Sequence, residues 1–251
     1  MVRYRKIHNT YLSQLGFNRV GDSWIRIVSD VIQTFRLKSM VGSKCYTIDF
    51  GVFPLCMPIN CCDMGAYSLN HFSSNPIVYD NGWKRWEKSP NTTDDCDDNI
   101  WTAFGKYLIP FFAQANSCEM ALRSMIELDE LFDRNRREVL QKASLPDCAT
   151  PWQKRSLCAP EKYYMALKCK DYQYALSFLH NELLMCEDTI CGNQSEYQPE
   201  IVIERHKERK AEALLHQTML NEGNPGFFDQ LLFENERISR ENIEKAMNEN
   251  K

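Results

Sequence analysis

Glycine is scarce in this chain of 251 residues, with 10 in all, which argues against glycine-rich phosphate-binding loops. No P-loop, no dinucleotide-binding fingerprint and no G-x-S-x-G nucleophile motif occurs in the sequence. The commonest nucleotide-binding and serine-hydrolase motifs are therefore missing. Enzymes without such a motif remain open.

An excess of positive charge is also missing, because the formal net charge is −4 at pH 7. A nucleic-acid-binding protein is expected to carry a basic patch, so this charge argues against DNA or RNA as the main partner. The run ERHKERK at 204–210 mixes both signs along a predicted helix. Such mixing indicates a solvated helix face rather than a nucleic-acid-binding arm.

Long hydrophobic runs are absent too. The longest, YLIPFFA at 107–113, is interrupted by Pro110 and is far shorter than the roughly 20 residues that span a membrane. The first 17 residues are basic, but no apolar stretch of about 7–15 residues follows, as a secretory signal would need. We therefore expect a cytoplasmic protein without a membrane partner, whose 11 cysteines are reduced thiols.

The cysteines and histidines form no recognisable metal-binding pattern. Neither C-x-x-C nor H-E-x-x-H occurs. His206 and His216 are ten residues apart, which places them about 80° apart on a helix, a poor geometry for one metal ion. The acidic run DDCDD at 94–98 precedes a predicted helix and is better explained as a cap than as a calcium site. We expect no metal and no cofactor, mostly buried cysteines and surface histidines.

Apolar side chains at helical spacing predict an amphipathic helix over residues 4–15. Gly16 follows it and can adopt the left-handed conformation that commonly ends a helix. Phe17 is then expected to pack back onto the helix.

Three segments of alternating polarity follow, at 23–29, 30–39 and 44–53. Their links are too short for a parallel crossover, so they predict a sequential antiparallel meander with one packed and one more open, polar face. The packed face is expected to carry Gln33, Phe35, Leu37, Ile48, Phe50 and Val52. The polar face is expected to carry Thr34, Arg36, Lys38, Thr47 and Asp49, together with Arg26 if the strand registers permit.

Helical patterns dominate the rest of the chain. A helix over 100–111 is expected to kink or break at Pro110, and Ser117 is expected to cap the next one, which continues toward Leu140. Beyond the proline-containing stretch 144–151, only helices are predicted, at 161–187, 201–221 and 227–248. The first of these ranges is a helical hairpin that resembles one tetratricopeptide-like unit, whereas a solenoid needs about three. We predict an α+β protein, with an antiparallel meander packed by helices over 1–145 and an all-helical C-terminal domain over 146–251.

Three stretches carry a resemblance to a known family: YLSQLGFNRVGDSWIRI at 11–27, DVIQTFRLKS at 30–39 and YTIDFGVF at 46–53. They resemble a bacterial family of domains of unknown function, numbered 4304, over roughly residues 8–142. The resemblance implies a fold of helix, antiparallel sheet and helices, with a downstream tryptophan that Trp83 or Trp86 supplies. It implies no known activity. The cysteine- and proline-containing stretch 54–63 departs from the family pattern.

Two functions remain open, and a non-enzymatic protein-interaction or regulatory module is favoured. A toxin-neutralising role is one example, by analogy only. The alternative is a small-molecule sensor or enzyme with a shallow site between the polar sheet face and the irregular segment 54–99. Either function would use Arg26, Arg36, Asp49 and Trp83 as binding residues.

The polar sheet face also has a simpler explanation, a solvated surface with pairing charges worth about 0.2–1 kcal/mol each. Gln33 is expected to be structural rather than ligand-binding, because a buried amide on an apolar face needs hydrogen-bond partners. The sequence leaves the oligomeric state open.

Overall fold

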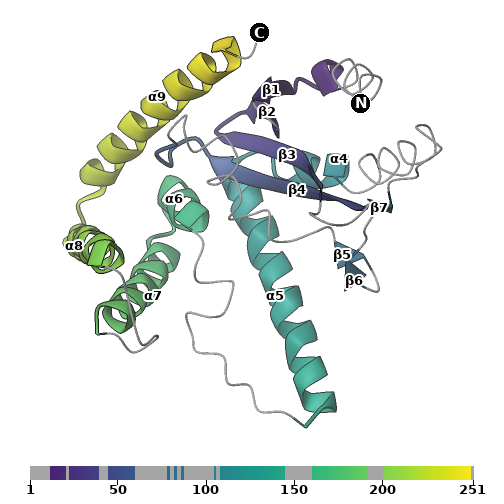
Figure 1. Cartoon of the computed structure of the whole chain (residues 1–251). Helices are drawn as coiled ribbons and strands as arrows, with labels where there is room; N and C mark the ends of the chain where they lie inside the picture. The colour runs from purple at the N-terminus through teal and green to yellow at the C-terminus, as the bar shows by residue number, and fades with distance from the viewer. Residues whose placement is uncertain are drawn as a thin grey trace. The chain divides into compact units, whose positions relative to one another are not determined.

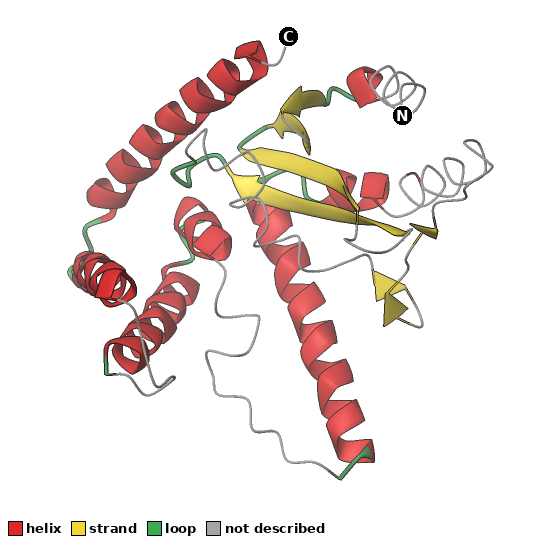
Figure 2. Ribbon diagram, in the orientation of Figure 1, coloured by secondary structure: helices red, strands yellow, loops and turns green. Residues whose placement is uncertain are grey.

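The computed structural model describes residues 12–20, 23–39, 45–59, 78–79, 82–83, 86–87, 105, 108–144, 160–191 and 200–249. Strands lie in the first part of the chain and helices in the second, as the ribbons in Figures 1 and 2 show. The chain forms two compact units, one of residues 1–121 with 234–251 and one of residues 122–233. The predicted domain boundary at 145 lies outside the described residues, so that division stays a prediction.

The first unit, which we call the sheet unit, contains a five-stranded antiparallel sheet in the order β1-β2-β3-β4-β7. Its strands are β1 (Asn18–Val20), β2 (Ser23–Val28), β3 (Val31–Ser39), β4 (Cys45–Pro54) and β7 (Trp86–Glu87). A separate two-stranded sheet pairs β5 (Val78–Tyr79) with β6 (Gly82–Trp83). The predicted meander and the α+β class are confirmed.

The turn between β2 and β3 sets the register of the sheet. Ser29 takes a left-handed φ of 54°, and the two-residue link pairs Val28 with Val31. Paired residues of antiparallel strands share a face of the sheet. Arg26, which pairs with Gln33, therefore faces the opposite side from Arg36, which pairs with Asp49. The expectation that Arg26 and Arg36 share the polar face is wrong.

The face that carries Gln33 is covered by aromatic side chains. Phe17 packs edge-on against Phe35, with ring centroids 5.3 Å apart, and contacts Phe112 of α4 (Ile109–Gln114) at 5.7 Å. The helical turn before Phe17 ends at Gly16 as predicted, since Gly16 has a φ of 81°. The Phe17 N–H donates to the Leu12 carbonyl at 2.9 Å. Phe17 and Leu12 are both buried.

The other face of the sheet packs against the last helix, α9 (Pro225–Glu249). One cluster of buried side chains joins six strand or loop positions to that helix: Val20, Ile25, Ile32, Phe53, Leu55 and Ile59 with Ile243 and Ala246. Ser239 Oγ donates to the Met57 carbonyl at 2.7 Å and accepts from the Ile59 N–H at 3.2 Å. All five residues of β3 from Val31 to Phe35 are consequently buried. The expectation of an open second face is wrong for this half of the sheet.

One further helix start, after Ser117, agrees with the sequence, whereas most of the helix predicted over 100–111 lies outside the described residues. Pro110 lies in the first turn of α4, where its missing N–H leaves no helical hydrogen bond unmade. Helix α5 (Cys118–Lys142) begins after Ser117, whose Oγ accepts from the Met120 N–H at 3.3 Å. Asp30 adds a second cap, since its Oδ1 accepts from the Cys118 N–H at 2.9 Å.

The second unit, which we call the helical unit, contains most of α5, all of α6 (Pro160–Lys168), α7 (Tyr172–Ile190) and α8 (Glu200–Asn221), and the first residues of α9. The predicted hairpin of α6 and α7 is confirmed. Its tight turn places Lys170 at a φ of 59°, and Asp171 Oδ1 accepts from the Tyr174 N–H at 3.1 Å. In the described part of the chain, no helix is both long enough and apolar enough to cross a membrane.

Candidate functional site

Arg26, the first residue proposed from the sequence as a binding residue, is held within the sheet unit. Its Nε donates to Gln33 Oε1 at 2.7 Å and its Nη1 to the Leu15 carbonyl at 2.7 Å. The guanidinium carbon also lies 4.5 Å from the centre of the Phe17 ring. Burial lowers the pKa of Arg26, but an arginine remains charged in proteins. These contacts make Arg26 a structural residue.

Gln33 is the polar centre of this arrangement. It is fully buried, and its Nε2 donates to the carbonyls of Phe112 at 2.6 Å and Ala115 at 2.9 Å. The amide therefore joins β3 to the end of α4 and offers its oxygen to Arg26. The structural role predicted for Gln33 is confirmed.

The other proposed binding residues are not brought together. Arg36 and Asp49 are opposite each other in the β3–β4 register, but their side chains lie outside the described residues. Trp83 belongs to β6, in the separate two-stranded sheet, and its side chain is also outside them. Most of the segment 60–99 is outside as well, so the proposed site along the polar sheet face stays a prediction.

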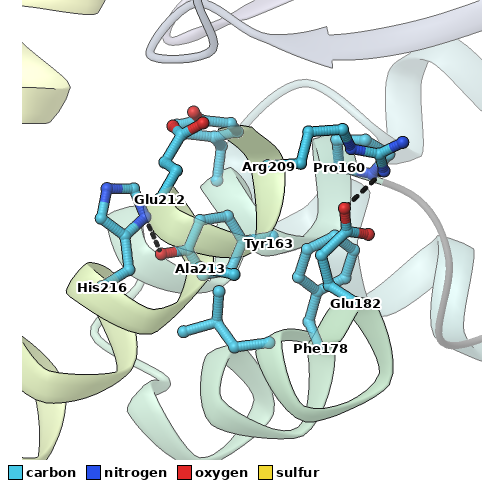
Figure 3. A pocket seen from close by; sticks show the side chains of 10 residues that line it. Pro160, Tyr163, Phe178, Glu182, Arg209, Glu212, Ala213 and His216 are labelled. Carbon is cyan, nitrogen blue, oxygen red and sulfur yellow. Dashed lines mark hydrogen bonds and ion pairs between the residues drawn. The ribbon is translucent and has the colours of Figure 1, made fainter. Parts of the chain in front are cut away.

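A pocket that the sequence does not reveal lies in the helical unit, between α6, α7 and α8 (Figure 3). We call it the α6–α8 pocket. Its volume is about 130 Å³, and it is lined by Pro160, Tyr163, Tyr164, Phe178, Leu179, Glu182, Arg209, Glu212, Ala213 and His216.

Aromatic rings form the apolar wall of the α6–α8 pocket. Tyr163 stacks on Phe178 with ring centroids 5.1 Å apart and meets Tyr164 edge-on at 5.3 Å. The small side chains of Ala175 and Ala213, both buried, let the helices approach closely. Figure 3 shows Tyr163 in the middle of the pocket, with Phe178 and Ala213 beside it.

A buried hydrogen bond closes one side of the pocket. Tyr163 Oη and His216 Nδ1 are 2.8 Å apart, and both side chains are buried. Burial lowers the pKa of His216 and raises the pKa of Tyr163, so both groups are neutral near pH 7. Phe227 and Phe228 meet the His216 ring edge-on from the start of α9.

His216 contradicts the prediction that the histidines lie at the surface. Helix α8 buries only Ala213 and His216 among its described side chains, whereas Leu214 and Leu215 are 46% and 49% exposed. A reading of apolar periodicity places the leucines inside, so it assigns the wrong face to the interior. The Tyr163–His216 bond is a contact between residues far apart in sequence, which local patterns do not report.

Charged groups surround the mouth of the pocket. Arg209 Nη2 contacts Glu182 Oε1 at 2.5 Å, and Glu182 is only 11% exposed. A parallel ion pair joins Lys210 to Glu187 at 2.9 Å, one turn further along α7. Glu212 is exposed and has no hydrogen bond or ion pair within the described part of the structure, although its charge acts on Tyr163 and His216.

The chemistry of the α6–α8 pocket suits binding better than proton transfer. Burial raises the pKa of the Tyr163 phenol, so the phenol is a poor nucleophile, and His216 Nδ1 is already engaged by it. Over the described residues, no group of three histidines, cysteines or acids is placed to hold a metal ion.

A comparison of this chain with protein families, curated proteins and solved structures finds no match.

Proposed function

We propose that this chain is a non-enzymatic protein-interaction module and that the α6–α8 pocket holds one anchoring side chain of a partner protein. The size of the pocket carries the proposal. At about 130 Å³ it is well below the roughly 300–1,000 Å³ of typical small-molecule sites, and it matches a single side chain. Interfaces gain much of their affinity from one or a few side chains that fill such aromatic-lined pockets.

The polar groups of the pocket support the same function. Tyr163 and His216 satisfy each other, as do Glu182 and Arg209, so the cavity is preorganised before a partner arrives. Preorganisation lowers the entropy cost of binding, which helps a small contact area to be effective.

The location of the module is part of the proposal. We place it in a bacterial cytoplasm with its thiols reduced. Among the described cysteines, Cys118, Cys186 and Cys191 are free thiols, which supports this. The resemblance to the family of unknown function fits a bacterial source but implies no activity of its own.

The proposal can be tested on an array of 15-residue peptides of varied sequence. Purified protein should bind a subset of these peptides, and Ala213→Leu, which fills the pocket from a buried position, should abolish that binding. Ala211→Leu is the matched control, because Ala211 is an exposed residue of the same helix and does not line the pocket.

A second variant protects the test against misfolding. Glu212→Trp covers the mouth of the pocket from an exposed position and should leave the helical circular dichroism and the melting temperature unchanged. If both pocket variants bind the same peptides as the unmodified protein, or if no peptide binds above background, the proposed function is wrong.

A further inference from the structure

Of the two acidic side chains that line the α6–α8 pocket, only Glu182 forms an ion pair with a described residue. Arg209, the cation at its mouth, is occupied by Glu182. Glu212, the second acid of the lining, has no ion pair or hydrogen bond with any described residue. Among the described residues, the pocket therefore presents aromatic rings together with one carboxylate that has no cationic partner.

We infer that the anchoring side chain is a lysine, whose ammonium group is held by Glu212 and by the rings of the α6–α8 pocket. This inference rests on the proposed function and adds the chemistry of the partner. A cation is attracted to the negative faces of aromatic rings, with tyrosine among the suitable rings. An exposed carboxylate next to such rings adds charge complementarity that no neutral side chain can use.

The size of the pocket agrees with a lysine. About 10–15 Å³ of such space is enough for one water molecule, so about 130 Å³ has room for the several heavy atoms of one side chain. The part of lysine beyond its β-carbon contributes three methylene carbons and one nitrogen. Its carbons can contact Leu179 and Phe178, while its nitrogen stays near the mouth.

An anionic side chain is disfavoured by the same residues. It would meet the negative ring faces and the Glu212 carboxylate, while Arg209, the one cation among the described lining residues, already contacts Glu182. A neutral apolar side chain would fill the cavity but leave the Glu212 charge unused. Charge complementarity therefore selects a cationic side chain, and we take lysine, the shorter of the two permanently charged ones.

The direct test uses n-butylammonium as a mimic of the lysine side chain and 1-butanol as a neutral control of equal length. Binding to the purified full chain is followed by NMR, through the methyl signal of Ala213. Butylammonium should shift this signal with a saturable dependence, and butanol should bind about fivefold more weakly. Glu212→Gln should weaken butylammonium binding about fivefold. The control Glu208→Gln removes an equal charge from an exposed position outside the pocket and should change the affinity for butylammonium less than twofold.

Equal binding of butanol and butylammonium, no binding of butylammonium, or no effect of Glu212→Gln would each overturn the lysine inference. The peptide array separates this failure from failure of the proposed function. Pocket-dependent peptides that contain no lysine, or that tolerate norleucine in its place, overturn the inference and leave the proposed function standing. If no peptide depends on the pocket, both are overturned.

Discussion

Replacing Gln33 with leucine should destabilise the sheet unit much more than an ordinary polar-to-apolar change. The substitution removes an acceptor for Arg26 Nε and two donors to the carbonyls of Phe112 and Ala115. Phe112 and Ala115 are fully buried, so water cannot easily replace the lost amide. Each orphaned group costs about 1–3 kcal/mol, while burial of the leucine side chain returns about 1.5–3 kcal/mol. We expect a net loss of about 2–4 kcal/mol in the free energy of unfolding.

Hydrogen exchange measured by mass spectrometry is the suitable assay, because it reports the opening of β3 separately from the helical unit. Peptides that cover β3 and α4 should lose protection in Gln33→Leu. Gln14→Leu is the matched control, since Gln14 is exposed and its replacement should change stability by no more than about 0.5 kcal/mol.

A second variant separates the acceptor from the donors. Gln33→Glu keeps an acceptor for Arg26 but directs a carboxylate oxygen at two carbonyls, so it should be destabilising near pH 7 and less so at low pH. If Gln33→Leu loses less than about 1 kcal/mol, or gains stability, the buried hydrogen bonds do not hold β3 to α4 and the reasoning fails.

Three further predictions follow from other buried polar groups. Burial raises the pKa of Glu161 to about 7 from its usual 4.5, and its Oε2 has no hydrogen-bond partner among the described residues. Because the folded state holds this proton more tightly, the contribution of Glu161 to the free energy of unfolding should be largest below about pH 4.5 and should fall by at most about 3 kcal/mol as the pH rises through 7. Urea titrations that compare the unmodified protein with Glu161→Gln should show this loss in the unmodified protein only. Tyr163→Phe should lower the free energy of unfolding, measured by heat or urea, by about 1–2 kcal/mol, because it leaves His216 Nδ1 without a hydrogen-bond partner. Adding His216→Phe should recover most of this loss. If the effects of the two substitutions are fully additive, the contact is contradicted. Ser239→Ala should cost about 1–3 kcal/mol and increase hydrogen exchange at Ile59, whereas unchanged exchange there would exclude the bond to Ser239.

The sequence predicts the parts of this fold that local rules control. The two-residue link at Ser29 and Asp30 is too short for anything but an antiparallel hairpin. Gly16 predicts a helix end because a glycine readily takes the positive φ that commonly ends a helix. Gln33 could also be interpreted in advance, because an amide among apolar neighbours needs partners. In each case the cause lies within a few residues of the effect.

The features that the sequence does not predict depend on contacts between distant segments. Arg26 was assigned to the wrong face because the alternation within a strand does not give its register with the next one. Nothing near Ile32 or Thr34 indicates that α9 buries their side of the sheet. The α6–α8 pocket was missed for a related reason, since α8 turns Ala213 and His216 inward and leaves Leu214 and Leu215 exposed.

The return of α9 to the sheet has a consequence for synthesis of the protein. Ser239 follows its hydrogen-bond partner Ile59 by 180 residues. At about 5–20 residues per second, a ribosome needs roughly 10–40 s to make that stretch, whereas a β-hairpin forms in about 1–10 μs. The nascent meander can therefore pair its strands long before Ile243 and Ala246 exist to cover Ile25 and Ile32. During that interval the growing chain exposes an apolar surface on the sheet. Chaperones bind surfaces of this kind.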